Sequence, residues 1–254
     1  MSALSTFKVP LPRVTLFELQ VINPGILLVT INRTQRMNAL PMLGHHVGSA
    51  IWNWLDDEPS MRVAVITGKG SKMFCAGADL LEQCDARQGE QRSQGVPEGG
   101  FAGLSQRRGK KPVIAAVNGL ALGGGFEIDM VVTSPNAEFP LPEVLRGLYA
   151  GAGGLARVVR NCGMQIGSEL ALTGRRLTAQ EAKAFNLVNR ISASHESVLE
   201  EALSLAKQIA SMPPNAIIVT RSGLREAWEA AKILRIGLEA FAAKKQPQWV
   251  DSKL

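Results

Sequence analysis

Three consecutive glycines, set between a short apolar segment and a glutamate, constrain this chain more than any other feature of its sequence. The apolar segment covers residues 113–117, the glycines are Gly123–Gly125, and the glutamate is Glu127. This pattern predicts a strand, a tight turn and the first turn of a helix that carries Glu127. Glycine has no Cβ, and the first amides of a helix lack an internal partner. Several N–H groups would therefore face a ligand at this turn.

A second acid, Glu143, follows a strand-like segment and precedes another glycine cluster at 151–154. Two carboxylates held between flexible backbone segments suit general acid/base chemistry on a carbonyl compound. The amides of the glycine turn would stabilise an oxyanion. One such donor can lower the reaction barrier by about 3 kcal/mol. On spacing alone, a glycine-rich turn that only packs closely on a sheet is an equal alternative.

The length of the chain, 254 residues, allows one large domain or a domain with an appendage, and it allows a sizeable core. No apolar run is long enough to cross a bilayer. Residues 1–14 lack the apolar core of a signal peptide, and we expect them to form a loose arm.

The cysteines and histidines do not form the patterns of a metal site or a catalytic triad. The three cysteines have no metal-ligand or C-x-x-C spacing, which favours reduced thiols in an intracellular compartment, with Cys75 a buried bystander. His45, His46 and His195 lie outside all other motifs, so we expect no metal site and no histidine-based triad.

A formal net charge of +6 is compatible with nucleic acid, an acidic membrane or a polyphosphorylated ligand. The basic residues are scattered in short pairs, and a single tyrosine leaves few platforms on which bases could stack. A ligand such as coenzyme A, with its phosphates, accounts for this modest surplus more simply than nucleic acid.

Hydrophobic periodicity and turn residues divide the chain into short strands and amphipathic helices. A polar segment with four glycines, residues 86–100, is expected to be mobile. Asp79 is expected to cap a helix, and Thr178 and Glu181 form a capping box. The expected strands are a hairpin of 17–20 and 26–32, then 63–67, 112–117 and 187–191; the expected helices are 42–55, 155–161, 165–173, 178–186, 196–211 and 216–245.

Four segments of the chain resemble signature segments of the enoyl-CoA hydratase/isomerase (crotonase) superfamily, in that family's order. They are INRTQRMNAL at 31–40, AVITGKGSKMFCAGADL at 64–80, the stretch 115–154 that contains AAVNGLALGGGFEI and LPEVLRGLYAGAGG, and ALTGRRLTAQEAKAFNLVNRI at 171–191. The resemblance extends from about residue 26 to residue 247. It implies an α/β fold in which residues 1–191 form a spiral of repeated ββα units, and residues 192–254 a helical subdomain that forms trimers or hexamers.

The resemblance also implies an activity, the hydration of a trans-2-enoyl-CoA thioester through an enolate-like intermediate. Glu143 would exchange the proton at C2, while Glu127 would orient and deprotonate water that the N–H of Gly151 helps to place. The N–H groups of Ala78 and Gly124 would form the oxyanion hole. No metal or redox cofactor is implied, because coenzyme A enters as part of the substrate. Further contacts with substrate or coenzyme A are expected at Arg33, Arg36, Asn38, Ala39, Ala76, Asp79, Leu80, Phe241 and Lys244.

One departure from the family pattern keeps other activities open. Glu127 and Glu143 are 16 residues apart, about four fewer, or one helical turn, than in the hydratases that the chain resembles. The helix could end early and leave Glu127 in place, or the strand before Glu143 could shift. The alternatives are a Δ3,Δ2-enoyl-CoA isomerase, which needs Glu143 alone, other acyl-CoA chemistry, and a non-catalytic homologue that binds CoA or RNA.

The final tripeptide, Ser252-Lys253-Leu254, is the peroxisomal targeting signal. It predicts recognition by the peroxisomal import receptor and a location in the peroxisomal matrix.

Overall fold

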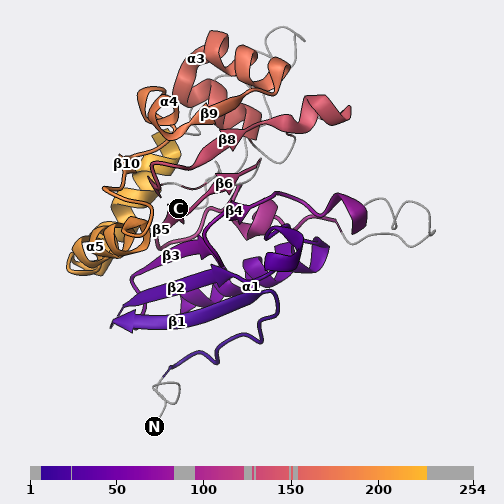
Figure 1. The fold of residues 1–254 in the computed structure, drawn as a ribbon. Helices are drawn as coiled ribbons and strands as arrows, with labels where there is room; N and C mark the ends of the chain where they lie inside the picture. Colours follow the sequence, from indigo (N-terminus) through magenta and orange to yellow (C-terminus); the bar gives the residue numbers. More distant parts are fainter. Residues whose placement is uncertain are drawn as a thin grey trace, which may run out of the picture. The chain divides into compact units, whose positions relative to one another are not determined.

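The computed structural model describes residues 7–23, 25–82, 95–122, 128, 130–148, 150 and 154–227 (Figure 1). The chain divides into two compact units, Met1–Met212 and Pro213–Leu254. In the second unit, the described residues 214–227 are helical, as the sequence predicts. The elements below belong to the first unit.

A six-stranded sheet, in the order β1-β2-β3-β5-β7-β10, forms the centre of this unit. β1 and β2 form the antiparallel hairpin expected from the sequence, and β2, β3, β5, β7 and β10 run parallel to one another. Figure 1 shows β1, β2 and β3 side by side. The strands are β1 Phe17–Asn23, β2 Ile26–Ile31, β3 Val63–Gly68, β5 Val113–Val117, β7 Met130–Thr133 and β10 Arg190–Ile191.

Both faces of the sheet are covered, which explains why its parallel strands are apolar throughout. Successive residues of a strand point to opposite faces. In β3, Ala64 and Ile66 belong to the core cluster that contains the buried face of α1 (Met42–Asp57). Val63 and Val65 belong to the cluster that contains Val198, Ala202 and Ala206 of α5 (Val198–Ala210).

Each of the strands β3, β5 and β7 is followed in the chain by a short strand outside the large sheet. These are β4 (Met73–Cys75), β6 (Leu120–Ala121) and β8 (Glu138–Pro140). β4 pairs with β6, and β8 pairs with β9 (Arg176–Thr178). The chain thus repeats a ββ unit as it winds along the sheet, and the predicted α/β spiral is confirmed.

The remaining helices connect and cover these strands. α3 spans Gly154–Thr173 but breaks at Gly163, whose φ of 81° is left-handed, so the two helices predicted here are confirmed. α4, Ala179–Ala184, begins with the predicted capping box of Thr178 and Glu181. The described residues also form three short 3₁₀ helices, η2 (Thr34–Arg36), η3 (Phe101–Gly103) and η5 (Pro142–Arg146).

The N-terminal arm is not loose from Phe7 onward, contrary to the expectation. The Phe7 ring packs edge-on against Trp54 of α1, with ring centroids 5.2 Å apart. The Trp54 indole N–H donates to the Val9 carbonyl at 2.9 Å, and the Val9 amide donates to Glu58 Oε2 at 2.9 Å. Hydrogen-bond partners on α1, which composition does not reveal, hold the arm in place.

Glu127, which the sequence places in the first turn of a helix, lies outside the described residues. Ile128 is a bend, and β7 begins at Met130. Only two residues therefore separate Glu127 from β7.

The predicted domain boundary at residues 191 and 192 falls inside the first unit, because α5 packs on the large sheet. A trimer-forming role for the C-terminal residues stays a prediction. No helix among the described residues is long and apolar enough to cross a membrane.

Candidate active site

The first element of the site is the turn that follows β4. The Ala76 amide donates to the Met37 carbonyl at 3.1 Å, and the Asp79 amide donates to the Leu40 carbonyl at 2.9 Å. Between them, the Ala78 amide has no acceptor among the residues that the structure describes. Ala78 is therefore placed by hydrogen bonds on both sides with its own N–H available, as an oxyanion donor requires.

An ion pair supports this turn. Arg33 Nη1 donates to Asp79 Oδ2 at 2.6 Å and to the Ala39 carbonyl at 2.9 Å. Asp79 Oδ1 accepts the amides of Leu81 and Glu82 at 3.1 and 3.4 Å, so its predicted capping role is confirmed. Burial alone would raise the pKa of Asp79, but the hydrogen bonds from Arg33 and these amides outweigh it and lower the pKa.

Asn38 fixes the loop that carries Arg33. Its side chain is buried and donates to the carbonyls of Lys69 and Met73 at 3.1 and 2.9 Å, while its Oδ1 accepts the Arg33 amide at 3.0 Å. Asn38 adopts a left-handed φ of 55°, a conformation that asparagine tolerates well. The loop expected to meet coenzyme A is thus held rigidly against the chain after β3.

The predicted contact residues of this region share one hydrogen-bonded unit but differ in exposure. Arg33, Asn38 and Asp79 form its interior. Arg36 and Leu80 are exposed on its surface, where they are free to meet a ligand. The partly buried residues Ala39 and Ala76 lie between these two groups.

Glu143 lies in the first turn of η5 and is partly buried. Its Oε2 is buried and has no hydrogen-bond partner within the described part of the chain. Burial raises the pKa of this carboxyl above its ordinary value of 4.5. The Leu148 amide donates to the Glu143 carbonyl at 2.9 Å, which closes the turn. A desolvated carboxyl with an unused oxygen is suited to taking and returning a proton.

Several predicted site residues lie outside the described residues. They are Gly124, Glu127, Gly151, Phe241, Lys244 and the tripeptide Ser252-Lys253-Leu254.

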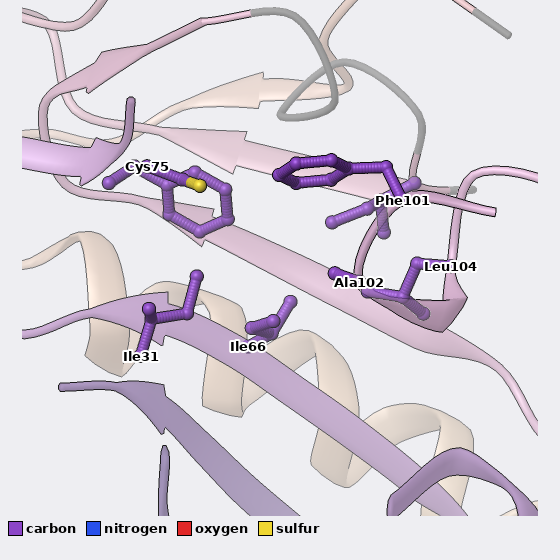
Figure 2. Close-up of a pocket in the computed structure, with 8 residues that line it drawn as sticks. Ile31, Ile66, Cys75, Phe101, Ala102 and Leu104 are labelled. Atoms are coloured by element: carbon purple, nitrogen blue, oxygen red, sulfur yellow. The ribbon is translucent and has the colours of Figure 1, made fainter. Parts of the chain in front are cut away.

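A small apolar cavity lies between the large sheet and η3 (Figure 2). Cys75 immediately precedes the Ala76–Asp79 turn, and Ile128 immediately follows Glu127 in the sequence, so the cavity adjoins segments that carry two predicted functional groups. The Cys75 thiol donates to the Asn38 carbonyl at 3.2 Å, and burial raises its pKa to about 12, so the expected bystander role is confirmed. The cavity is lined by Ile31, Ile66, Phe74, Cys75, Phe101, Ala102, Leu104 and Ile128.

Two residues of α1, which no motif had singled out, hold the loop that lines this cavity. His45 Nδ1 accepts the Ala102 amide at 3.1 Å, and the Trp52 indole N–H donates to the Ala102 carbonyl at 2.8 Å. Burial, with a smaller contribution from His46, lowers the pKa of His45 to about 4, so the ring is neutral at pH 7. The one signal in the sequence was Gly48, a small residue where α1 meets η3 closely.

A third missed residue, Asn118, joins the ends of β3 and β5. Its side-chain amide donates to the Gly68 and Gly70 carbonyls at 2.8 and 2.6 Å. It directly precedes the segment that leads to the glycine run, and it fixes where that segment leaves the sheet. Among the described residues, no group of histidine, cysteine and acidic side chains could hold a metal ion.

Comparison with known proteins assigns this chain to a family. The model of the enoyl-CoA hydratase/isomerase family matches residues 21–251, and the chain belongs to that family. A mevalonyl-coenzyme A hydratase from Beauveria bassiana is 42% identical over 98% of this chain and 100% of its own length. Another from Aspergillus fumigatus is 41% identical over 91% of this chain and 93% of its own length.

The solved structure of an enoyl-CoA hydratase from Mycobacterium tuberculosis has the same fold. It matches with a TM-score of 0.76 and 32% identity, over 93% of this chain and 99% of that one.

Proposed function

We propose that this chain is a hydratase-type crotonase that adds water across, or removes water from, the C2–C3 bond of an acyl-CoA thioester. The observation that carries this proposal is Glu143, a partly buried carboxyl with a raised pKa and an unpartnered buried oxygen. The free amide of Ala78 supports it, because the reaction requires a donor for the thioester oxygen as negative charge develops there.

In the proposed mechanism, Glu143 transfers the proton at C2. The Ala78 amide, together with that of Gly124, stabilises the enolate-like oxygen. Glu127 activates the water that adds at C3, and the Gly151 amide orients it. In the direction of dehydration, the same groups act in reverse: Glu143 removes the C2 proton and Glu127 protonates the departing hydroxyl.

For the substrate, we propose mevalonyl-CoA, the thioester of 3,5-dihydroxy-3-methylpentanoate. The support is the 42% and 41% identity with two mevalonyl-coenzyme A hydratases over at least nine-tenths of this chain. Removal of the C3 hydroxyl with a C2 proton yields a conjugated thioester, which is the type of product that the proposed site forms. We propose that no metal or redox cofactor takes part.

The test is the change in conjugated enoyl-thioester absorbance when purified protein meets mevalonyl-CoA, with crotonyl-CoA as the unbranched comparison. Glu143→Gln and Glu127→Gln are assayed beside the wild type. The proposal expects wild-type turnover that either substitution abolishes, with mevalonyl-CoA preferred. Turnover of crotonyl-CoA alone would reject the substrate, and no turnover of either would reject the hydratase.

A second candidate, Δ3,Δ2-enoyl-CoA isomerisation, is favoured by one observation. β7 begins three residues after Glu127, which leaves too short a segment for the further helical turn that the family resemblance implies there, whereas Glu143 lies on η5. An isomerase that uses Glu143 alone would keep its activity in Glu127→Gln. A 3-enoyl-CoA substrate in the same assay separates the two candidates.

We also propose that Arg36 contacts the phosphates of coenzyme A, that Phe241 and Lys244 contribute to its binding, and that the chain assembles as a trimer or a pair of trimers. Ser252-Lys253-Leu254 would direct it to the peroxisomal matrix through the import receptor. A fluorescent protein fused before residue 1, with and without the last three residues, tests this location. Equal distribution of the two fusions would reject it.

A further inference from the structure

Arg157 of α3 reaches the backbone that directly follows Glu127. Its Nη1 donates to the Ile128 carbonyl at 3.0 Å, across 29 positions of the sequence. The side chain of Arg157 is partly buried, and Ile128 is 6% exposed. This contact joins the start of α3 to the segment that connects Glu127 with β7.

The position of Arg157 is electrostatically unfavourable for the helix itself. It lies in the first turn of α3, which begins at Gly154, and that turn contains no acidic residue. A cation near the N-terminus of a helix opposes the helix dipole. The dipole therefore does not favour an arginine here, whereas the Ile128 carbonyl gives its side chain an acceptor.

Two other contacts hold the described residues of this segment. β7 begins three residues after Glu127. The Ile128 side chain lies in the wall of the apolar cavity, and the Asn189 side chain accepts the Val131 amide at 2.7 Å. Ile128 is thus anchored by its side chain on one side and by Arg157 at its carbonyl.

We propose that Arg157 is a positioning residue for the water-activating half of the site. Arg157 lies on α3, the helix that begins directly after the Gly151–Gly153 segment. From there it fixes Ile128, the covalent neighbour of Glu127. This inference rests on the proposed function, because it assigns Arg157 to water activation by Glu127 and Gly151 and not to proton transfer by Glu143. Glu143 lies on η5, and the bond between Arg157 and Ile128 does not include it.

The test compares two readouts that the two halves of the site control separately. Hydration of the enoyl thioester requires both carboxylates, whereas exchange of the C2 hydrogens of a saturated acyl-CoA with D2O requires proton transfer and the oxyanion hole alone. Arg157→Gln and Arg157→Lys are made, with Arg160→Gln, an exposed position on the same helix, as the matched control. Thermal unfolding establishes that each variant is folded.

We expect Arg157→Gln to lower kcat for hydration about 100-fold, the effect of a displacement of about 1 Å, with KM and C2 exchange close to wild type. Arg157→Lys should recover part of the loss, because an ammonium can reach the same carbonyl but lacks the planar fork of arginine. If Arg157→Gln does not fold, Arg157→Lys carries the same comparison.

Unchanged hydration would overturn the inference. So would a parallel loss of hydration and exchange, or an equal loss in Arg160→Gln. Absence of both reactions in the wild type would reject the proposed function instead, which separates the two failures.

Discussion

The guanidinium of Arg33 and the carboxylate of Asp79 lie 2.6 Å apart, although 46 positions separate them in the sequence. Their side chains are only 16% and 9% exposed. Asp79 in turn caps the turn after Ala78 and anchors it to Leu40. The charge of Arg33, which we expected to contact substrate or coenzyme A, thus supports the turn that carries Ala78, the proposed oxyanion donor.

Replacing Arg33 by glutamine should lower kcat as well as stability. It leaves a largely buried carboxylate without its charged partner, at a cost of about 1–3 kcal/mol in the free energy of unfolding. Loosening the turn should misplace the Ala78 amide, whose proposed role in the transition state would make the loss appear in kcat. Steady-state kinetics and urea unfolding measure both effects. Arg36→Gln, at an exposed position, should instead raise KM alone. The same pattern in Arg33→Gln would indicate that Arg33 contacts a phosphate of coenzyme A and does not support the turn.

Glu143→Gln should separate catalysis from stability. Loss of the proton-transfer group should lower the rate by about 10²–10⁴-fold. Burial raises the pKa of Glu143, so the folded state retains its proton more strongly than the unfolded state does, and stability falls as pH rises from 4.5 through the folded pKa. The neutral glutamine removes this penalty.

The variant should therefore be at least as stable as the wild type at pH 7, with a flatter dependence on pH. Glu138→Gln, which breaks an exposed ion pair with Arg176, is the control with an intact site. A marked loss of stability in Glu143→Gln would mean that the carboxylate has an ionic partner. That result would contradict the observation that Oε2 is unpaired.

His45 should make the protein sensitive to mild acid. Its pKa falls from 6.5 to about 4 on folding, so the unfolded state binds the proton more tightly between these values. The stability is complete above pH 6.5 and declines toward pH 4, by about 3 kcal/mol in total for this group. Urea unfolding between pH 4 and 7 measures the decline.

His45→Gln keeps an acceptor for the Ala102 amide but does not titrate, so the decline should be smaller in this variant by the same amount. The control is a substitution at another histidine, His195, whose Nδ1 lies 2.9 Å from Ser134 Oγ. An identical acid profile in His45→Gln and wild type would exclude His45 as the source.

Local patterns in the sequence were sufficient to predict most of the large sheet, but not β7. The aliphatic and β-branched segments of β1 and β2, the apolar run of β3 and the capping box at Thr178 depend on neighbours close in the chain. The cap at Asp79 is equally local. These signals determined the α/β class, and the resemblance supplied the spiral that the ββ repeats confirm.

Long-range pairing of charges was not predictable in the same way. Lys111 belongs to one of the short basic pairs of the sequence. The structure buries it, and its Nζ donates to the Leu55 and Glu58 carbonyls at the end of α1, at 2.8 and 2.7 Å. A sequence shows that a charge is present, but its partner depends on how distant elements pack. The same reason hid the partners of Arg33 and Arg157.

Strand β7, Met130–Thr133, was missed for a local reason. Four residues are too few to distinguish a strand from part of a helix, because periodicity needs a longer segment to be visible. The partner strand β5 lies outside the segment, and its parallel pairing with Val131 and Val132 determines the outcome.

Gly48→Ala tests how closely α1 holds the loop that lines the cavity. A Cβ at this position would lie 2.3 Å from the Ala102 carbonyl oxygen, which the Trp52 indole N–H fixes. Because a backbone atom held in this way cannot move aside cheaply, we expect a loss of about 1–3 kcal/mol in the free energy of unfolding. Gly44→Ala on the same helix meets Leu40 side-chain atoms at 3.1 and 3.2 Å, which can shift. Its helix propensity gain of about 1 kcal/mol should offset that contact.

Displacement of Ala102 and Leu104 should also change the preference of Gly48→Ala between mevalonyl-CoA and crotonyl-CoA if the cavity receives the acyl group. A variant with lowered stability and an unchanged preference would show that the cavity is part of the core alone.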